Sequence, residues 1–122
     1  MRKTLSKILD KGKFSVNGSL WMEKEETRFF GPGPVELLQY IDETGSINQA
    51  AKKMQMSYKK AWEIVHNLNT ITTKPFVITA SGGEKGGGSS ISTEAKELIA
   101  YYRLLRHRFS KFLQQESGRL TK

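Results

Sequence analysis

Helix stop and start signals follow one another closely in the middle of the chain, and their spacing limits the folds that the chain can adopt. Gly45 suits the left-handed conformation that ends a helix, and Ser46, directly after it, can cap the next helix. Ser57 can cap a further helix after the turn Gln55-Met56. The helix between the two serines must therefore be short, with a tight turn at each end.

Apolar residues in this region fall at helical spacing and define three helices. Pro34 suits the first helical position, where an N–H group is not needed. Ser46 and Gln49 predict a capping box, in which each side chain bonds the backbone N–H of the other residue. The expected inward positions are, in chain order, Leu37, Leu38 and Ile41, then Ile47, Ala50, Ala51 and Met54, then Ala61, Ile64, Val65 and Leu68.

Two β-hairpins are predicted, one on each side of these helices. Residues 14–22 alternate apolar and polar side chains about Asn17-Gly18, which is a strong hairpin signal. Phe29-Phe30 adds a third short strand to this N-terminal hairpin. The second hairpin covers residues 75–92, and its tip is the glycine-rich loop 81–89.

A long helix is expected at the C-terminal end, over about residues 93–114 with Thr93 as its cap, and a short helix in the first ten residues. The apolar residues of the long helix alternate spacings of three and four, which is typical of a coiled-coil seam. Its first two turns suffice to close the core. We therefore expect the rest, with the N-terminal strands, to form a homodimer interface that includes Leu98, Tyr102, Leu105, Phe109 and Phe112.

This order of elements predicts an α+β fold, a winged helix-turn-helix with an N-terminal β-hairpin and a long C-terminal dimerisation helix. The 122 residues supply one domain, with its core at about 14–92. In such a fold the second helix of the pair enters the DNA major groove, and the hairpin wing lies along the phosphates or the minor groove.

The charge balance favours a polyanionic partner. Lys and Arg number 20 against 12 Asp and Glu, which gives a formal net charge of +8.

The absence of cysteine excludes disulfides, thiol catalysis and cysteine metal sites. No apolar run has the length of a membrane span or a secretory signal, so we expect a cytoplasmic protein that binds no membrane.

The polar face of the helix at 57–72 carries side chains that can read DNA. Lys59, Glu63, His66 and Thr70 lie opposite the apolar stripe, with Lys60 and Asn67 beside them. Lysine can donate to guanine, asparagine can pair with adenine, and glutamate can accept from cytosine. We expect Tyr58 to bond a phosphate and Trp62 to pack beneath the wing, although a solvated helix surface would also carry lysine and glutamate.

The glycine-rich loop could be either a wing or a phosphate-binding loop of a nucleotide site. Gly83 and Gly88 have the spacing of the latter, but Ser89 stands where its lysine belongs, and a strand rather than a helix follows. We therefore expect a wing in which Lys85 meets a phosphate and the backbone uses the conformational freedom of Gly82, Gly83, Gly86, Gly87 and Gly88.

Nothing in the sequence forms a catalytic or metal-binding pattern. His66 and His107 are far apart, and neighbouring carboxylates such as Glu25-Glu26 point in different directions. We expect no enzyme activity, no metal site and no cofactor.

Several motifs resemble the N-terminal DNA-binding domain of the molybdate-responsive regulator ModE over about residues 14–113. They are Gly45-Ser46-Ile47, Ala50-Ala51, Met56-Ser57-Tyr58-Lys59, Ala61-Trp62, Leu68-Asn69, and the double and triple glycines of the wing. The helix-turn-helix part alone is also similar to LysR-type regulators. The resemblance implies Ser57, Tyr58, Lys59 and Lys60 as the recognition segment. We expect the chain to depart from ModE in lacking its oxyanion-binding domains.

The leading hypothesis is thus a sequence-specific transcriptional regulator that binds double-stranded DNA at a palindromic operator as a homodimer. A separate effector protein stays open as a further partner. The alternative is a winged-helix module that uses the same surface to bind a protein or RNA.

Overall fold

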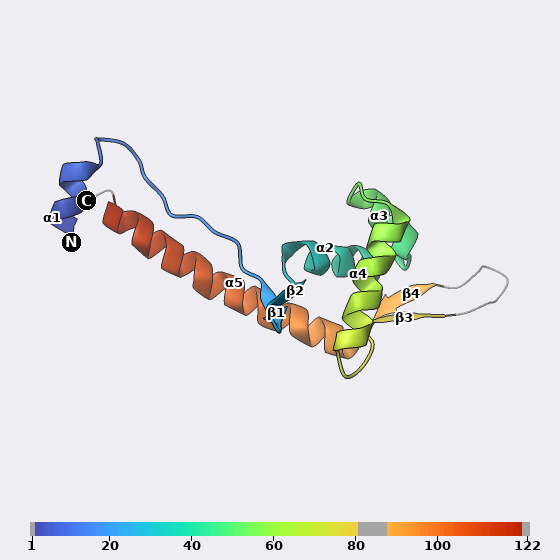
Figure 1. The fold of residues 1–122 in the computed structure, drawn as a ribbon. Coiled ribbons are helices and arrows are strands. Elements are labelled where there is room, and N and C mark those ends of the chain that lie inside the picture. The colour runs from blue at the N-terminus through green and yellow to red at the C-terminus, as the bar shows by residue number, and fades with distance from the viewer. Residues whose placement is uncertain (1, 81–87, 121–122) are drawn as a thin grey trace. The chain divides into compact units, whose positions relative to one another are not determined.

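The computed structural model describes residues 2–80 and 88–120, which form an α+β arrangement of helices and small antiparallel sheets (Figure 1). The helices are α1 Arg2–Ile8, α2 Pro32–Thr44, α3 Ile47–Lys53, α4 Tyr58–Ile71 and α5 Thr93–Leu120. Strand β1 (Met22–Lys24) pairs with β2 (Thr27–Phe30), and β3 (Val77–Thr79) pairs with β4 (Ser89–Ile91). The chain divides into two compact units, one of residues 21–101 and one of residues 1–20 with 102–122.

The predicted helix boundaries near α2 and α3 are confirmed in part. Gly45 adopts the left-handed conformation with φ 71°, and its N–H donates to the Ile41 carbonyl, as expected for a helix end. Helix α2 begins at Pro32, two residues before the predicted Pro34, because Pro32 also fits the first helical position. Gly31 caps it in an extended conformation.

Only one half of the predicted capping box of α3 forms. The Ser46 hydroxyl accepts the N–H of Gln49 at 3.1 Å. The Ser46 N–H, however, donates to the Thr44 hydroxyl at 3.2 Å rather than to the side chain of Gln49. Thr44 lies only two residues away and satisfies this N–H, so no second bond from Gln49 is needed.

The N-terminal hairpin exists, but the predicted turn was wrong. The turn is Glu25-Glu26, where both residues have positive φ (49° and 69°), the geometry of a two-residue turn that matches the twist of paired strands. Residues 9–21 form no strand. The expected turn at Asn17-Gly18 is replaced by a segment that runs along α5.

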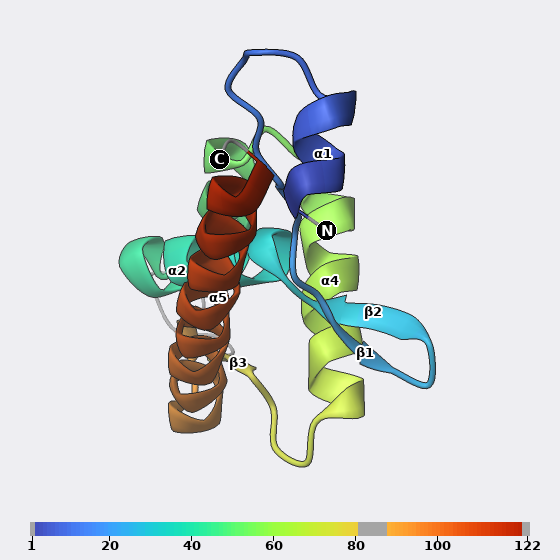
Figure 2. The same cartoon turned by 90° about the vertical axis from the view of Figure 1, so that its left-hand side faces the viewer.

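This segment and the second half of α5 form the smaller unit. The Val16 N–H donates to the Ser117 hydroxyl at 2.8 Å, and the Tyr102 hydroxyl donates to the Leu20 carbonyl at 2.8 Å. A Cβ atom at Gly18 would lie 3.2 Å from the ring of Phe109. The segment thus runs antiparallel to α5, as both ribbon views show (Figure 2).

Helix α5 differs from the prediction at both ends and along its buried face. Ser92, not Thr93, caps it, since the Ser92 hydroxyl accepts the N–H of Ala95 at 3.2 Å. The helix continues to Leu120 instead of ending near residue 114. The residues buried along it are Ala95, Ile99 and Tyr102, whereas Leu98 is half-buried and Phe112 is 55% exposed. A straight helix has 3.6 residues per turn, so its inward face drifts away from a strict heptad.

The core of the larger unit is apolar and joins β2, α2 and α4. Phe30, Leu37, Leu38, Ile41 and Leu68 are fully buried. The rings of Phe30 and Phe76 meet edge to face, with 6.1 Å between their centroids. Most predicted inward positions are therefore confirmed, while Met54 and Ile64 are only half-buried.

In the ranges that the structure describes, every helix is too short or too polar to cross a lipid bilayer.

Gly31→Ala is expected to lower the free energy of unfolding by about 1–3 kcal/mol through overpacking. The added methyl group would lie 2.5 Å from a ring atom of Trp21, so the indole must move off its position. Chemical denaturation would measure the change. Gly33→Ala is the matched control, because nothing lies within 4 Å of a Cβ atom there. Equal stability of the two variants would contradict this packing.

Candidate nucleic-acid interface

The turn between α3 and α4 is closed by backbone hydrogen bonds at the end of α3. Gln55 has φ 55°, and its N–H donates to the Lys52 carbonyl at 3.1 Å. The next N–H, of Met56, reaches back to the Ala51 carbonyl at 3.0 Å. These two bonds form a Schellman motif, with glutamine at the position that glycine usually occupies. The chain thereby reverses within a few residues and delivers α4 beside α3 (Figure 1).

Small buried residues and a side-chain cap fix the start of α4. Ala50, Ala51 and Ala61 are at most 1% exposed, which lets the backbones of α3 and α4 approach closely. The Ser57 hydroxyl accepts the N–H of Lys60 at 3.0 Å. The cap uses the backbone of Lys60, so the side chain of Lys60 is free to serve another purpose.

The seven residues of α4 and its N-cap that are predicted to contact DNA are all exposed: Ser57, Tyr58, Lys59, Lys60, Glu63, His66 and Asn67. Neither Lys59 nor Lys60 forms an ion pair within the described part of the chain. The buried side of the same helix consists of Ala61, Val65 and Leu68. Helix α4 therefore holds a polar face toward solvent while its other face is locked into the core.

Trp62 was expected to pack beneath the wing, whose residues 81–87 lie outside the described residues. Its ring stacks on the imidazole of His66, with 4.9 Å between centroids and 7° between planes. It remains 47% exposed. The stacked pair is thus part of the outer surface of α4.

The predicted wing loop falls largely outside the described residues. Lys85 and four wing glycines, Gly82, Gly83, Gly86 and Gly87, belong to the range 81–87 that the structure does not describe. The fifth wing glycine, Gly88, belongs to the described residues, and its carbonyl accepts the N–H of Ala80 at 2.8 Å. This bond continues the β3–β4 ladder by one step toward the loop.

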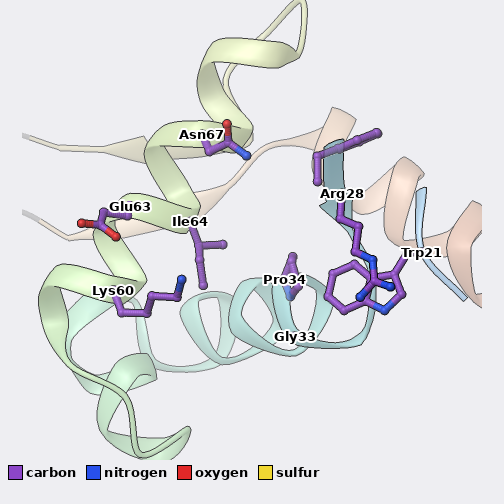
Figure 3. A pocket seen from close by; sticks show the side chains of 9 residues that line it. Trp21, Arg28, Gly33, Pro34, Lys60, Glu63, Ile64 and Asn67 are labelled. Atoms are coloured by element: carbon purple, nitrogen blue, oxygen red, sulfur yellow. The ribbon is translucent and has the colours of Figure 1, made fainter. Parts of the chain in front are cut away.

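A groove of about 400 Å³ borders α4 on the side of the β1–β2 hairpin (Figure 3). Figure 3 shows Lys60, Ile64 and Asn67 on the side of α4 that faces Pro34, whereas the carboxylate of Glu63 points away. The other lining residues are Trp21, Arg28, Phe29 and Gly33. Two cationic side chains, from α4 and from β2, therefore border one groove.

Arg28 and Trp21 were missed by the sequence reasoning. The guanidinium carbon of Arg28 lies 5.1 Å from the centre of the Trp21 ring, a cation–π contact that holds the charge in place. The wrong hairpin turn concealed them, because Arg28 acquires its direction only from the pairing of β2 with β1. An arginine beside Phe29-Phe30 in the expected third strand was the available signal.

Asn69 connects α4 to the second hairpin. Its side-chain oxygen accepts the N–H groups of Phe76 at 2.8 Å and Val77 at 3.1 Å. Its side-chain nitrogen donates to the Val77 carbonyl at 3.1 Å. The amide thus satisfies three backbone groups at the start of β3. The position of the hairpin base is therefore tied directly to α4.

The residues predicted to form a dimer interface lie in several environments. Tyr102 is 3% exposed, and Phe109 lies against Gly18 of the same chain. Leu98 and Leu105 are half-buried, and Phe112 is exposed. The N-terminal segment thus covers part of the surface that the prediction assigned to a second copy.

Among the described residues, no cluster of His, Asp or Glu could hold a metal ion.

Comparison with known proteins finds relatives but no matching family model. Over 102 residues the chain is 39% identical to "Transcriptional regulator ModE" of Haemophilus influenzae, covering 80% of this chain and 40% of that protein. It is 36% identical over 87 residues to "Molybdenum transport protein ModE" of Azotobacter vinelandii, covering 71% and 32%.

A third relative is "DNA-binding transcriptional dual regulator ModE" of Escherichia coli, 35% identical over 86 residues, covering 70% of this chain and 33% of that protein. The matches thus span about a third to two fifths of the length of these relatives. The resemblance to ModE is confirmed, and this chain is a homologue of part of the ModE transcriptional regulators.

Proposed function

We propose that the chain is a sequence-specific DNA-binding transcriptional regulator, with α3 and α4 as a helix-turn-helix and the β3–β4 hairpin as its wing. The observation that carries this proposal is the two-sided character of α4. Its inner face is buried, its outer face is polar, and its first turn carries two lysines that form no ion pair with the described residues. A recognition helix needs this combination of a fixed axis and free hydrogen-bonding side chains.

The side chains on α4 divide into those suited to bases and those suited to phosphates. Lys59 and Asn67 can donate to guanine and pair with adenine, respectively, and Glu63 can accept from cytosine. Lys60 and Arg28 border the groove beside α4, where they suit the phosphate backbone. Phosphate contacts would set the position of the protein, and base contacts its specificity.

The names of the Haemophilus influenzae and Escherichia coli relatives support a role in transcription, and that of the Escherichia coli protein includes DNA binding. We further propose a homodimer on a palindromic operator, in the cytoplasm. A two-fold axis would present two copies of α4 to half-sites about one helical turn apart. The exposed Phe112 on α5 is available for such an interface.

Binding to duplex DNA across a range of salt concentrations tests this function against the alternative. A regulator that makes six to ten phosphate contacts should lose about 10³–10⁵-fold in affinity between 50 and 200 mM salt. Fluorescence anisotropy with a labelled duplex and a labelled RNA hairpin would measure this. Tighter binding to the RNA, or a failure to bind either nucleic acid, would favour the interaction module.

A further inference from the structure

The net positive charge of the chain comes from residues outside the unit that contains α4. Residues 21–101 carry nine Lys and Arg against ten Asp and Glu. Residues 1–20 and 102–122, which we call the basic arm, carry eleven against two. The unit with the candidate recognition helix therefore has a slight excess of acid and, as a whole, does not attract a polyanion.

The cationic side chains of the basic arm that the structure describes are exposed. Lys7 lies on α1, Lys11 and Lys13 lie on the N-terminal segment between α1 and β1, and Arg103, Arg106, Arg108 and Lys111 lie on α5. None of these seven forms an ion pair within residues 2–80 and 88–120. In the basic arm, Arg119 contacts Glu116 at 3.4 Å. This one ion pair leaves most of the positive charge of the basic arm uncompensated.

Like charges stand at helical neighbour positions on α5. Arg103 and Arg106 are three residues apart, and so are Arg108 and Lys111. Such pairs destabilise a helix when no counter-charge is near. The four cations fall within about 12 Å of helix axis, at 1.5 Å per residue. An array of closely spaced anions would relieve this repulsion, and duplex DNA carries one negative charge per about 1.7 Å.

The arm is also held together as a unit. The hydrogen bonds from Val16 to Ser117 and from Tyr102 to Leu20 fix the N-terminal segment along α5. Lysines of the N-terminal segment and arginines of α5 therefore belong to one scaffold.

We propose that the basic arm binds the phosphate backbone of duplex DNA without sequence preference and supplies most of the salt-dependent affinity. The proposal rests on the proposed function, because it assumes that α4 reads the same duplex. In this division of labour the arm holds the protein on DNA, and α4 selects the site. Counterion release by the arm gives the affinity its dependence on salt.

The test compares two double variants with equal loss of charge. Arg103→Gln with Arg106→Gln removes two cations of the arm, and Lys74→Gln with Lys96→Gln removes two exposed cations of the other unit. Affinity for an operator and for a scrambled duplex is measured from low to moderate salt. We expect the arm variant to lose about tenfold on both duplexes and to lower the salt slope by about two, as expected for two lost phosphate contacts. The control should change neither value appreciably.

A conservative double variant distinguishes a structural role of the two arginines from the role of their charge. Arg103→Lys with Arg106→Lys keeps the charges and should restore the slope. At 100° per residue both arginines lie away from Phe112, so sedimentation should show an unchanged oligomeric state.

An arm variant that behaves like the control, while the unmodified protein binds duplex DNA specifically, would overturn this inference and leave the proposed function intact. An unmodified protein that binds no duplex, or that binds only vesicles containing anionic lipid, would overturn both.

Discussion

Replacing Asn69 by alanine is expected to lower the free energy of unfolding by about 2–4 kcal/mol. Three hydrogen bonds to Phe76 and Val77 would be lost together. Both partners are at most 4% exposed, so water cannot easily replace the amide. Urea denaturation followed by circular dichroism would measure the loss.

Two further variants separate the role of Asn69 from a general effect of substitution on α4. Asn67→Ala, two residues earlier on the exposed face, should change stability by less than about 0.5 kcal/mol. Asn69→Asp keeps the two accepting interactions but turns a second carboxylate oxygen, instead of an N–H donor, toward the Val77 carbonyl, so part of the loss is expected to remain. A loss in Asn69→Ala no larger than that in Asn67→Ala would show that the amide does not anchor β3.

Replacing Lys59 and Lys60 together by alanine is expected to weaken binding to the operator by about 10- to 100-fold, with the folded state intact. Each lysine that contacts DNA contributes about 1–3 kcal/mol if it reads a base, and less if it meets only phosphate. Both side chains are exposed, and the Ser57 cap uses the backbone N–H of Lys60, so the helix should keep its stability. Anisotropy titrations and thermal melts would measure both quantities.

The single variants distinguish base reading by Lys59 from a phosphate contact by Lys60. Lys59→Ala should relax one position of the recognised sequence, whereas Lys60→Ala, beside the groove, should weaken all duplexes alike. Lys74→Ala, beyond the end of α4, is the control of equal charge. Unchanged operator affinity in the double variant would remove α4 from the recognition role.

The helix pattern of the larger unit could be predicted because its signals are local. The serine caps, the glycine at the end of α2 and the apolar spacing of α4 each act within one or two turns of helix. The exposed face of α4 follows from the same periodicity. The candidate contact residues on that helix were therefore accessible from the sequence.

The hairpin turn could not be predicted in this way, because it depends on a contact distant in sequence. Asn17-Gly18 has the better local turn signal, yet Val16 is bonded to Ser117 and Gly18 lies against Phe109. Packing along α5 overrides local turn preference here. Glu25-Glu26 then adopts the turn, despite the strain of positive φ in residues other than glycine.

The same long-range packing involves the apolar residues of α5. The spacings of three and four in its apolar residues predict an interface with a second copy of the chain. The N-terminal segment occupies part of that surface within one chain, at Tyr102 and Phe109. Burial by its own chain and burial by a partner produce the same sequence pattern, so the pattern alone could not distinguish them.

Selection of bound fragments from a pool of random duplex DNA tests most directly whether α4 reads a sequence. The full chain is used, and the bound fragments are sequenced after several rounds at moderate salt. The expected result is enrichment of one palindromic sequence, with one position of each half-site relaxed in Lys59→Ala. Recovery of fragments with no common sequence, at an affinity equal to that of the starting pool, would contradict the proposed regulator.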